Sequence, residues 1–365
     1  KWVYNTSKYL VGTPTIGNLD DDDELEVCIG SYGPGNTGNA IYVVNHDGSL
    51  MNGFPYLINE KIKAGLSLGD FNNNLKDDIV FGTDSDNLYI ISDSGTLIDG
   101  FPFSVSDKIQ SSPSILDLGT EKLIFFGSKD DNFYCVDSQA TLIFSYLTDG
   151  NIYTSPSFYF DEAANQVYIF FGSDDGMVHA LDLNGNSIDG WPQSVGNEVI
   201  GSVLIQDLNG DSIKEVIAIS SSSVSIKDLS GQNFSYEYIA SDLQITGPPI
   251  INDTDNDGDL EILSGNSSGM LSIDIKDFSV GSDTSISMYK FNNHRNGLYF
   301  TSAGQVVGDL NSDTTLDILD IVQLINIVLG YQTPSNSQIW AGDLNSDNIF
   351  NILDIVILSN LVLEN

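Results

Sequence analysis

A unit of about 45 to 50 residues recurs through the first three hundred residues of this chain. Its most recognisable part is an acidic loop, which begins at Asn18, Asp70, Asp117, Asp207 and Asp253. The interval between the third and fourth of these is about double the others, because it contains a further unit whose loop, at residues 160–165, is less acidic. Repetition at such a period indicates an architecture of similar units rather than one irregular core.

Each unit predicts four short strands. A first strand leads into the acidic loop, and a second strand rich in Val, Ile and Phe follows it. We predict the third strands at residues 41–45, 88–92, 133–137 and 178–182, each ending in Asp, Asn, Ser and Gly residues typical of turns. A fourth segment follows Gly-Phe-Pro or Gly-Trp-Pro, and proline is tolerated at an outer edge strand.

Four antiparallel strands per unit of this length predict a mainly β fold, namely a β-propeller. Six units are visible, so we predict six blades, with seven as the alternative. Residues 1–11 are similar to the fourth-strand segments. We expect them either to complete the ring by pairing into the last blade or to be the remnant of a lost blade upstream.

The repeats resemble the FG-GAP and VCBS family of β-propellers over residues 12–300. The Gly-Ser or Gly-Thr that ends the second strand is kept at Gly30, Gly82, Gly127 and Gly172, and residues 287–299 are similar to the family's closing strand. In that family the acidic loop holds calcium through side chains at loop positions 1, 3, 5 and 9 and a carbonyl at position 7.

The resemblance implies up to four calcium ions in the propeller. Their ligands would be Asn18, Asp20, Asp22 and Glu26 in unit one, Asp70, Asn72, Asn74 and Asp78 in unit two, Asp207, Asn209, Asp211 and Glu215 in unit five, and Asp253, Asp255, Asp257 and Glu261 in unit six. Oxygens crowded into one tight loop repel one another unless a cation lies among them. The alternative is that these are solvated turn residues, above all in unit two, whose loop carries less charge. Units three and four depart from the pattern, and we assign them no metal.

A second duplication occupies the last 60 residues, where the sequence Gly-Asp-Leu-Asn-Ser-Asp occurs twice, with its first aspartates, Asp309 and Asp343, 34 residues apart. Oxygen donors then recur at positions 1, 3, 5, 7, 9 and 12 of a calcium loop, position 7 through its main-chain carbonyl. The two sets are Asp309, Asn311, Asp313, Thr315, Asp317 and Asp320, and Asp343, Asn345, Asp347, Ile349, Asn351 and Asp354. An apolar segment long enough for about three helical turns follows each loop.

This pair resembles the type I dockerin module, and the resemblance implies two calcium ions and a cohesin-type protein partner. At loop position 6, Thr314 and Asn348 replace the usual Gly. Dockerins read their partner at loop positions 10 and 11 and along the following helix. Here those positions are Ile318, Leu319, Ile352 and Leu353, so we expect an apolar docking surface in two near-duplicate copies. We divide the chain into a propeller at residues 1–300 and a small all-α calcium-binding module at residues 305–365.

The charge of the chain limits its partners. It has 13 Lys and Arg against 51 Asp and Glu, a net charge of −38, which disfavours nucleic acid and anionic membranes. No apolar run reaches transmembrane length. We expect Cys28 and Cys135 to be buried free thiols rather than a disulfide. Many weak calcium sites suit millimolar calcium, so we expect an extracellular or cell-surface protein whose secretion signal lies upstream of Lys1.

No catalytic constellation is recognisable. We find no repeat position shared by the histidines, which are His46, His179 and His294. The tyrosines of the third strands, Tyr42, Tyr89 and Tyr134, suit blade packing better than sugar binding. Packing and sugar binding are also the two alternatives for Trp2, Trp191 and Trp340. We therefore expect a non-catalytic, calcium-binding interaction protein, with the propeller as a recognition or spacer platform. The alternative is an accessory or catalytic component of an extracellular polysaccharide-degrading enzyme, and a glycan ligand at the propeller stays open.

Overall fold

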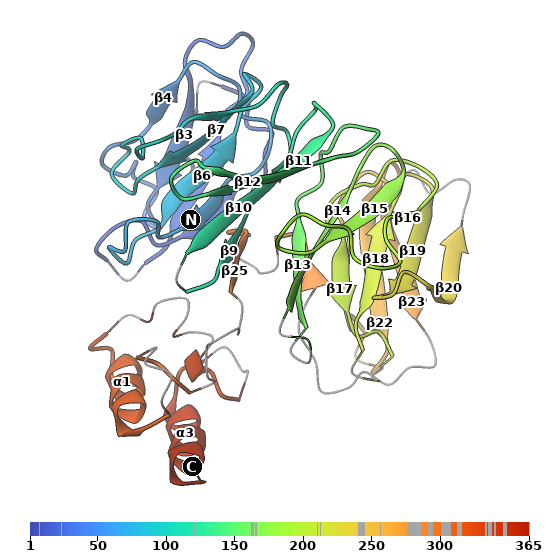
Figure 1. Ribbon diagram of the computed structural model, residues 1–365. Coiled ribbons are helices and arrows are strands. Elements are labelled where there is room, and N and C mark those ends of the chain that lie inside the picture. Colours follow the sequence, from blue (N-terminus) through green and yellow to red (C-terminus); the bar gives the residue numbers. More distant parts are fainter. Residues whose placement is uncertain are drawn as a thin grey trace. The chain divides into compact units, whose positions relative to one another are not determined.

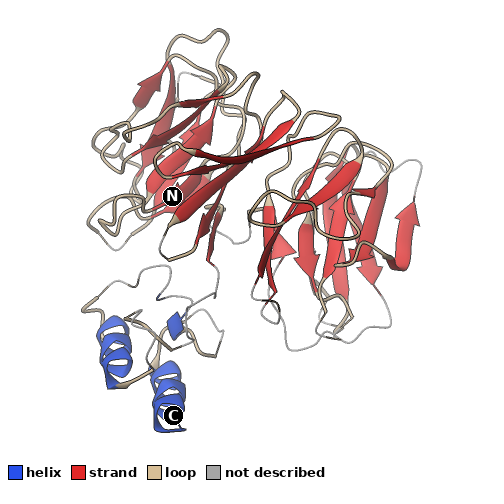
Figure 2. Cartoon of the chain, in the orientation of Figure 1, coloured by secondary structure: helices blue, strands red, loops and turns tan. Residues whose placement is uncertain are grey.

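The computed structural model divides into two compact units. The first comprises Lys1–Asp161 and Gln166–Tyr299, and the second comprises Glu162–Asn165 and Phe300–Asn365. The residues that the structure describes are 1–6, 8–22, 24–119, 121–161, 164, 166–209, 211, 213–239, 245–255, 257–275, 287–290, 295–300, 308–311, 316–332, 334, 338, 341–345 and 349–364. Strands occupy the first unit and helices the second (Figure 2).

The first unit contains six antiparallel sheets in the described residues, one for each sequence unit (Figure 1). Sheets one to three contain β1 (Thr15–Gly17), β2 (Glu26–Gly30), β3 (Asn39–Val44) and β4 (Tyr56–Ile58); β5 (Ser67–Gly69), β6 (Asp78–Gly82), β7 (Asn87–Ile91) and β8 (Phe103–Ser104); and β9 (Ser114–Asp117), β10 (Lys122–Gly127), β11 (Asn132–Asp137) and β12 (Leu142–Leu147) with β25 (Leu298–Phe300). Sheets four to six contain β13 (Ser157–Asp161), β14 (Gln166–Gly172), β15 (Met177–Leu181) and β16 (Gln193–Ser194); β17 (Leu204–Gln206), β18 (Glu215–Ile219), β19 (Ser223–Asp228) and β20 (Asn233–Ile239); and β21 (Ile250–Asn252), β22 (Leu260–Asn266), β23 (Gly269–Ile275) and β24 (Ser287–Met288). The prediction of a mainly β fold of four-stranded blades is confirmed.

Neighbouring sheets pack face to face through side chains that alternate along the strands. In β2 the residues at every second position, Glu26, Cys28 and Gly30, are buried towards the next sheet. Four apolar clusters join sheets one and two, three and four, four and five, and five and six. Cys28 and Cys135 are free and buried inside two of these clusters, as predicted.

The glycine that ends the second strand in sheets one to four has a packing role, whereas sheet five has Ile219 at this position. The chain that enters the following sheet places a β-branched side chain directly on each of these glycines. A Cβ atom on Gly127 would lie closer than 3.0 Å to Ile152, and one on Gly82 would meet Ile109 in the same way. The backbone holds this contact, because Ile152 N–H donates to the Ser128 carbonyl at 3.1 Å. Only a residue without a side chain fits between two sheets at this distance.

Residues 287–290 and 295–300, in the segment that resembles the family's closing strand, contact several sheets. β24 pairs with β21 of sheet six, whereas β25 pairs with β9 of sheet three as a fifth strand. Between them, the Asn296 carbonyl accepts from Leu68 N–H in sheet two at 2.8 Å, and the Arg295 carbonyl accepts from Thr15 Oγ1 in sheet one at 2.6 Å. The described residues of this segment therefore contact the first strands of four sheets, namely β21, β9, β5 and β1.

Of the two alternatives for residues 1–11, pairing into the last blade is wrong for the residues described, because they contact sheet one. Leu10 forms a β-bridge with Ser31, and Tyr32 N–H donates to the Tyr9 carbonyl at 2.8 Å. Trp2 Nε1 donates to the His46 carbonyl, also in sheet one, at 2.8 Å. Free backbone groups beside the end of β2 are satisfied by this segment, which explains why it stays with the sheet nearest in sequence.

The second unit contains helices α1 (Ile318–Val328) and α3 (Ile352–Glu364). Its core consists of Leu310, Leu324, Ile327 and Leu358, contributed by both copies of the duplicated sequence. Gly308 has a φ of +93° and lies under Leu316 and Leu358, so a side chain there would be strained and would clash. No described helix is long and apolar enough to cross a membrane.

Candidate calcium sites and docking surface

The four acidic loops predicted to bind calcium share one internal hydrogen bond. The last ligand of each loop is the first residue of a second strand or the one that follows it, and one of its oxygens accepts the N–H of the second loop residue. The donors and acceptors are Leu19 and Glu26 (2.9 Å), Phe71 and Asp78 (2.8 Å), Leu208 and Glu215 (2.7 Å), and Thr254 and Glu261 (2.6 Å). This bond turns each carboxylate back into its loop and leaves the second oxygen for another partner.

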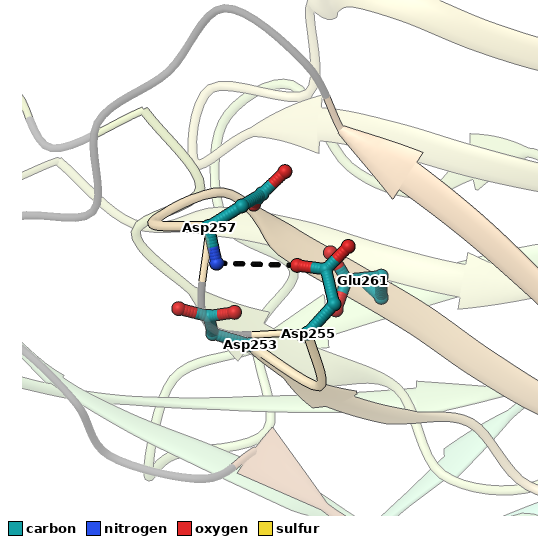
Figure 3. A group of neighbouring side chains, drawn as sticks. All are labelled: Asp253, Asp255, Asp257 and Glu261. Atoms are coloured by element: carbon teal, nitrogen blue, oxygen red, sulfur yellow. Dashed lines mark hydrogen bonds between the residues drawn. The ribbon is translucent and has the colours of Figure 1, made fainter.

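Sheet six carries the most complete set of ligands. Asp253, Asp255, Asp257 and Glu261 each place one oxygen so that all four oxygens lie within 4.8 Å of one another (Figure 3). Within the group, Asp257 N–H donates to Asp255 Oδ1 at 3.2 Å. Glu261 is buried, and its Oε1 has no hydrogen-bond partner. Four carboxylates, one of which has an unpaired buried oxygen, fit a hard cation such as Ca²⁺.

Sheet one carries the second set. Oxygens of Asp20, Asp22 and Glu26 lie within 4.8 Å of one another. Asn18 Oδ1 and Glu26 Oε1 are both buried without a hydrogen-bond partner. Burial, and then the neighbouring Asp20 and Asp22, raise the pKa of Glu26 to about 7. A cation in this loop would satisfy both oxygens and reverse the rise in pKa.

The loop of sheet two satisfies itself by hydrogen bonds. Asp78 Oδ1 accepts from Asn72 Nδ2 at 3.1 Å and from Asp93 N–H at 3.3 Å. Asp70 accepts from the backbone of Asn72 and Leu75. The remaining predicted ligand, Asn74, donates its N–H to Asp70 and is exposed. This loop therefore needs a cation less than the loops of sheets one and six.

Sheet five is intermediate. Asn209 Nδ2 donates to Asp211 Oδ2 at 3.1 Å, and burial followed by the charges of Asp207 and Asp211 raises the pKa of Glu215 to about 7. Among the described residues, the close gathering of three or more carboxylates is found in sheets one and six and not here. The order of fit is therefore sheet six, sheet one, sheet five and sheet two.

Sheets three and four replace the carboxylate that ends the loop. Four residues before Gly127 and Gly172, where sheet one has Glu26, these sheets have Leu123 and Tyr168. In sheet three the ammonium of Lys122 lies 3.2 Å from Asp117 Oδ2 and supplies an internal positive charge. The described residues of these two loops offer no facing carboxylates for a metal.

The two loops of the second unit have the same architecture. Asp320 and Asp354, at loop position 12, are both fully buried. Asp320 accepts from Leu310 N–H and Asp317 N–H, each at 2.9 Å, and Asp354 accepts equivalently from Leu344 and Asn351. Asp317 caps α1, so the loop ligands also begin the helix.

Other predicted ligands of this unit are placed less completely. Asp309, Asn311, Asp343, Asn345 and Ile349 are described, and Asp309 is buried. Asp313, Thr315 and Asp347 lie outside the described residues.

Two matching apolar faces are exposed at the starts of α1 and α3. Ile318 and Ile352 are 68% and 66% exposed, and Leu319 and Leu353 are each 56% exposed. Val322 and Val356, one helical turn further on, are also exposed and extend each face. Sequence reasoning missed these two valines, although their position four residues after Ile318 and Ile352 was the signal.

The histidines form no catalytic group in the described residues. His179 stacks on Phe171 with ring centroids 5.1 Å apart, as Tyr89 stacks on Phe81 and Tyr134 on Phe126, both at 5.3 Å. It therefore shares a repeat position with these tyrosines, although not with another histidine. Burial lowers its pKa, and Nε2 lies 3.1 Å from Asp175. His46 is exposed in a turn, and His294 lies outside the described residues.

Residues 307–363 match the family model described as Dockerin type I domain. Residues 307–363 are a dockerin type I domain. Dockerin type I domains bind calcium, so Ca²⁺ belongs to its two loops, and a dockerin implies a cohesin partner. Comparison with curated protein sequences gave no match.

Solved structures are similar to the chain in fold. BBS1N, from its complex with ARL6DN soaked with lead, has a TM-score of 0.51 at 12% identity, covering 76% of this chain and 78% of that one. The V. cholerae biofilm matrix protein Bap1 has a TM-score of 0.54 at 14% identity, covering 79% of this chain and 54% of that one. At these identities the likeness concerns the fold alone. The finer resemblance of the propeller to FG-GAP and VCBS repeats stays a prediction.

Proposed function

We propose that the chain is a secreted, non-catalytic interaction protein whose calcium-loaded dockerin domain docks onto a cohesin. The propeller serves as a rigid recognition or spacer platform. One observation carries the proposal: the dockerin domain presents two apolar faces of matching composition and exposure. Exposed apolar side chains gathered on so small a domain mark an interface.

Calcium supports both faces through the buried aspartates. Asp320 and Asp354 hold the backbone of the loops that begin α1 and α3, and Ile318 and Ile352 are the first residues of those helices. Loop residues that bind Ca²⁺ therefore fix the position of the apolar side chains that meet the partner. Without the ion, the negative loop oxygens would repel one another and release the start of each helix.

In the propeller we propose calcium in the loops of sheets six and one first, then five and two. The unpaired buried oxygens of Glu261, Glu26 and Asn18 support the first two assignments. Calcium there would stiffen the loops that join the first and second strands of these sheets. This suits a platform that holds its shape in extracellular calcium.

A binding experiment tests the docking proposal. The full chain is measured against a panel of purified type I cohesin domains by calorimetry, in calcium and in EGTA. We expect at least one cohesin to bind in calcium and binding to disappear in EGTA. Failure of every cohesin in calcium, or binding that persists in EGTA, would contradict the proposal.

A second candidate function, a component of a polysaccharide-degrading enzyme, is favoured by one cluster in the propeller. The ammonium groups of Lys63 and Lys129 lie 5.8 and 5.6 Å from the ring centroid of Tyr153, and Lys61 lies 5.1 Å from that of Tyr32. Basic and aromatic side chains together suit an acidic sugar.

The test of this candidate is incubation of the full chain with a soluble polyuronate. Calorimetry measures binding, and a reducing-end assay measures cleavage. We expect Tyr153→Ala to weaken any binding, with Tyr331→Ala, an exposed tyrosine of the dockerin domain, as the control. Absence of both binding and cleavage in wild type would remove this candidate.

A further inference from the structure

The predicted calcium loops of sheets one and two are joined by a reciprocal pair of hydrogen bonds between the partly buried Asn18 and the buried Asp77. Asn18 N–H donates to Asp77 Oδ2 at 3.1 Å, and Asp77 N–H donates to the Asn18 carbonyl at 2.7 Å. An ion pair adds to this link, because Lys76 Nζ lies 2.6 Å from Asp21 Oδ1. Two consecutive residues of the second loop therefore hold the first loop.

Asp77 is placed for this contact at an energetic cost. It is buried, and a carboxylate taken out of water is costly unless it is hydrogen-bonded. The Asp77 carboxylate has room here because residue 17 is a glycine. A Cβ atom at Gly17 would lie closer than 3.0 Å to that carboxylate. Sheets one and six have Leu25 and Leu260 at the equivalent position, so the propeller fold itself does not require an acid there.

The residues that form the link are neighbours of the predicted ligands. Asn18 is the first ligand of the sheet-one loop, and its buried Oδ1 has no hydrogen-bond partner. Asp77 lies between Lys76, whose carbonyl is at loop position 7 of sheet two, and Asp78, at position 9. An ion that fixes Asn18 therefore fixes the peptide to which Asp77 is bonded. It thereby orders the segment that supplies two ligands to the second ion.

We propose that Asp77 couples these two loops, so that calcium in sheet one raises the calcium affinity of sheet two. The inference rests on the proposed calcium sites of the propeller. The sheet-two loop has only two carboxylates, so its own charge attracts an ion less than the loops of sheets one and six do, and a neighbour that holds Asp77 in place adds most there. A loop already ordered by the first ion loses less conformational entropy when the second ion binds.

Electrostatics opposes this coupling, because the first ion neutralises charge that would attract the second. At about 0.15 M salt, charges in solvent are screened over about 8 Å, whereas direct hydrogen bonds between buried groups are not. We therefore expect the ordering effect to win at that salt concentration. Couplings between sites are about fivefold or more in affinity when a structural link carries them.

Native mass spectrometry of the full chain in about 0.15 M ammonium acetate tests the proposal. It counts bound ions as calcium is raised and gives a midpoint for the last ion to bind. Asp70→Ala should remove that last step and so assign it to sheet two. Asp20→Ala should remove one ion and raise the calcium concentration at the midpoint of the last binding step about fivefold. Asp77→Leu should remove no sheet-one ion and give the same shift, and the double variant should shift no further.

Two controls separate coupling from general loosening. Asp255→Ala removes an ion in sheet six and should leave the last midpoint unchanged. Ser114→Ala breaks another bond between sheets, Ser114 Oγ to the Pro156 carbonyl at 2.9 Å, and should also leave it unchanged. Asp77→Ala repeats the test with a smaller side chain if Asp77→Leu does not fold.

Three results would overturn the proposal. In the first, Asp77→Leu and Asp77→Ala leave the last midpoint in place. In the second, Asp20→Ala and Asp255→Ala shift it equally. In the third, neither Asp20→Ala nor Asp70→Ala lowers the ion count; the loops of sheets one and two then hold no calcium, and their calcium assignment fails together with the coupling. Docking of the dockerin domain onto a cohesin would be unaffected by any of these results.

Discussion

Replacing Ile318 and Leu319 by serine removes the apolar face of the first dockerin copy, and replacing Ile352 and Leu353 removes that of the second. Complete burial of such a side chain contributes about 1.5–3 kcal/mol. With Ile318 68% and Leu319 56% exposed, burying one face against a partner contributes about 2–4 kcal/mol. This amount corresponds to about 20-fold to 500-fold in affinity.

The two faces predict an unequal response to one and two substitutions. If a cohesin can dock on either face, removing one face halves the number of binding modes and costs about 0.4 kcal/mol, a twofold loss. Removing both faces should cost the full 20-fold to 500-fold or so.

Calorimetry of the full chain with a cohesin in calcium measures these losses. Leu329→Ser with Leu363→Ser is the matched control, since these exposed residues end the same two helices about 16 Å from Ile318 and Ile352. A loss of more than tenfold from one face alone would refute two-way docking. Wild-type affinity in the quadruple variant would place the interface elsewhere.

Three further predictions concern stability. EGTA should abolish the helical circular dichroism of the full chain, because bound calcium contributes about 2.7 kcal/mol per site at a hundredfold excess over Kd; an unchanged helical signal would contradict this. Asp255→Ala should remove more of the calcium-induced rise in Tm than Asn72→Ala, since sheet six offers four carboxylates and sheet two only two; equal losses would contradict the ranking. Gly127→Ala should lower the free energy of unfolding in urea by about 1–3 kcal/mol through its clash with Ile152, whereas Gly265→Ala, with nothing within 4 Å, should stay within about 1 kcal/mol of wild type.

The strands and the loops could be predicted because their signals are local. Third strands predicted at residues 41–45, 88–92, 133–137 and 178–182 correspond to β3, β7, β11 and β15 within about two residues at each end. Short runs of apolar and aromatic residues, followed by turn residues such as Asp, Asn and Gly, indicate such strands without any distant contact. The position of His179 was also predictable, since it follows Gly172 by the seven residues that separate Tyr134 from Gly127.

Contacts between distant parts of the sequence could not be predicted. Residues 287–300 contact the first strands of several sheets through backbone carbonyls such as those of Arg295 and Asn296, and a backbone contact leaves no pattern in the sequence. Asp77 looked like one more acidic loop residue, and only the structure places its carboxylate on Asn18 of the neighbouring sheet. The partner of a buried polar group is set by tertiary packing, which the local sequence does not encode.

The position of the acids relative to each core explains why calcium should act differently on the two units. In the propeller, β2 begins at Glu26 and ends at Gly30, so the calcium loop and the glycine that packs against the next sheet lie about 13 Å apart. Removing calcium therefore loosens a hairpin while the contacts between sheets persist. In the dockerin domain, Asp320 lies one helical turn before Leu324, a core residue on the same face of α1. Without the ion, the loop carboxylates next to this core repel one another. The dockerin domain should therefore lose its helices, whereas the propeller should only become less stable.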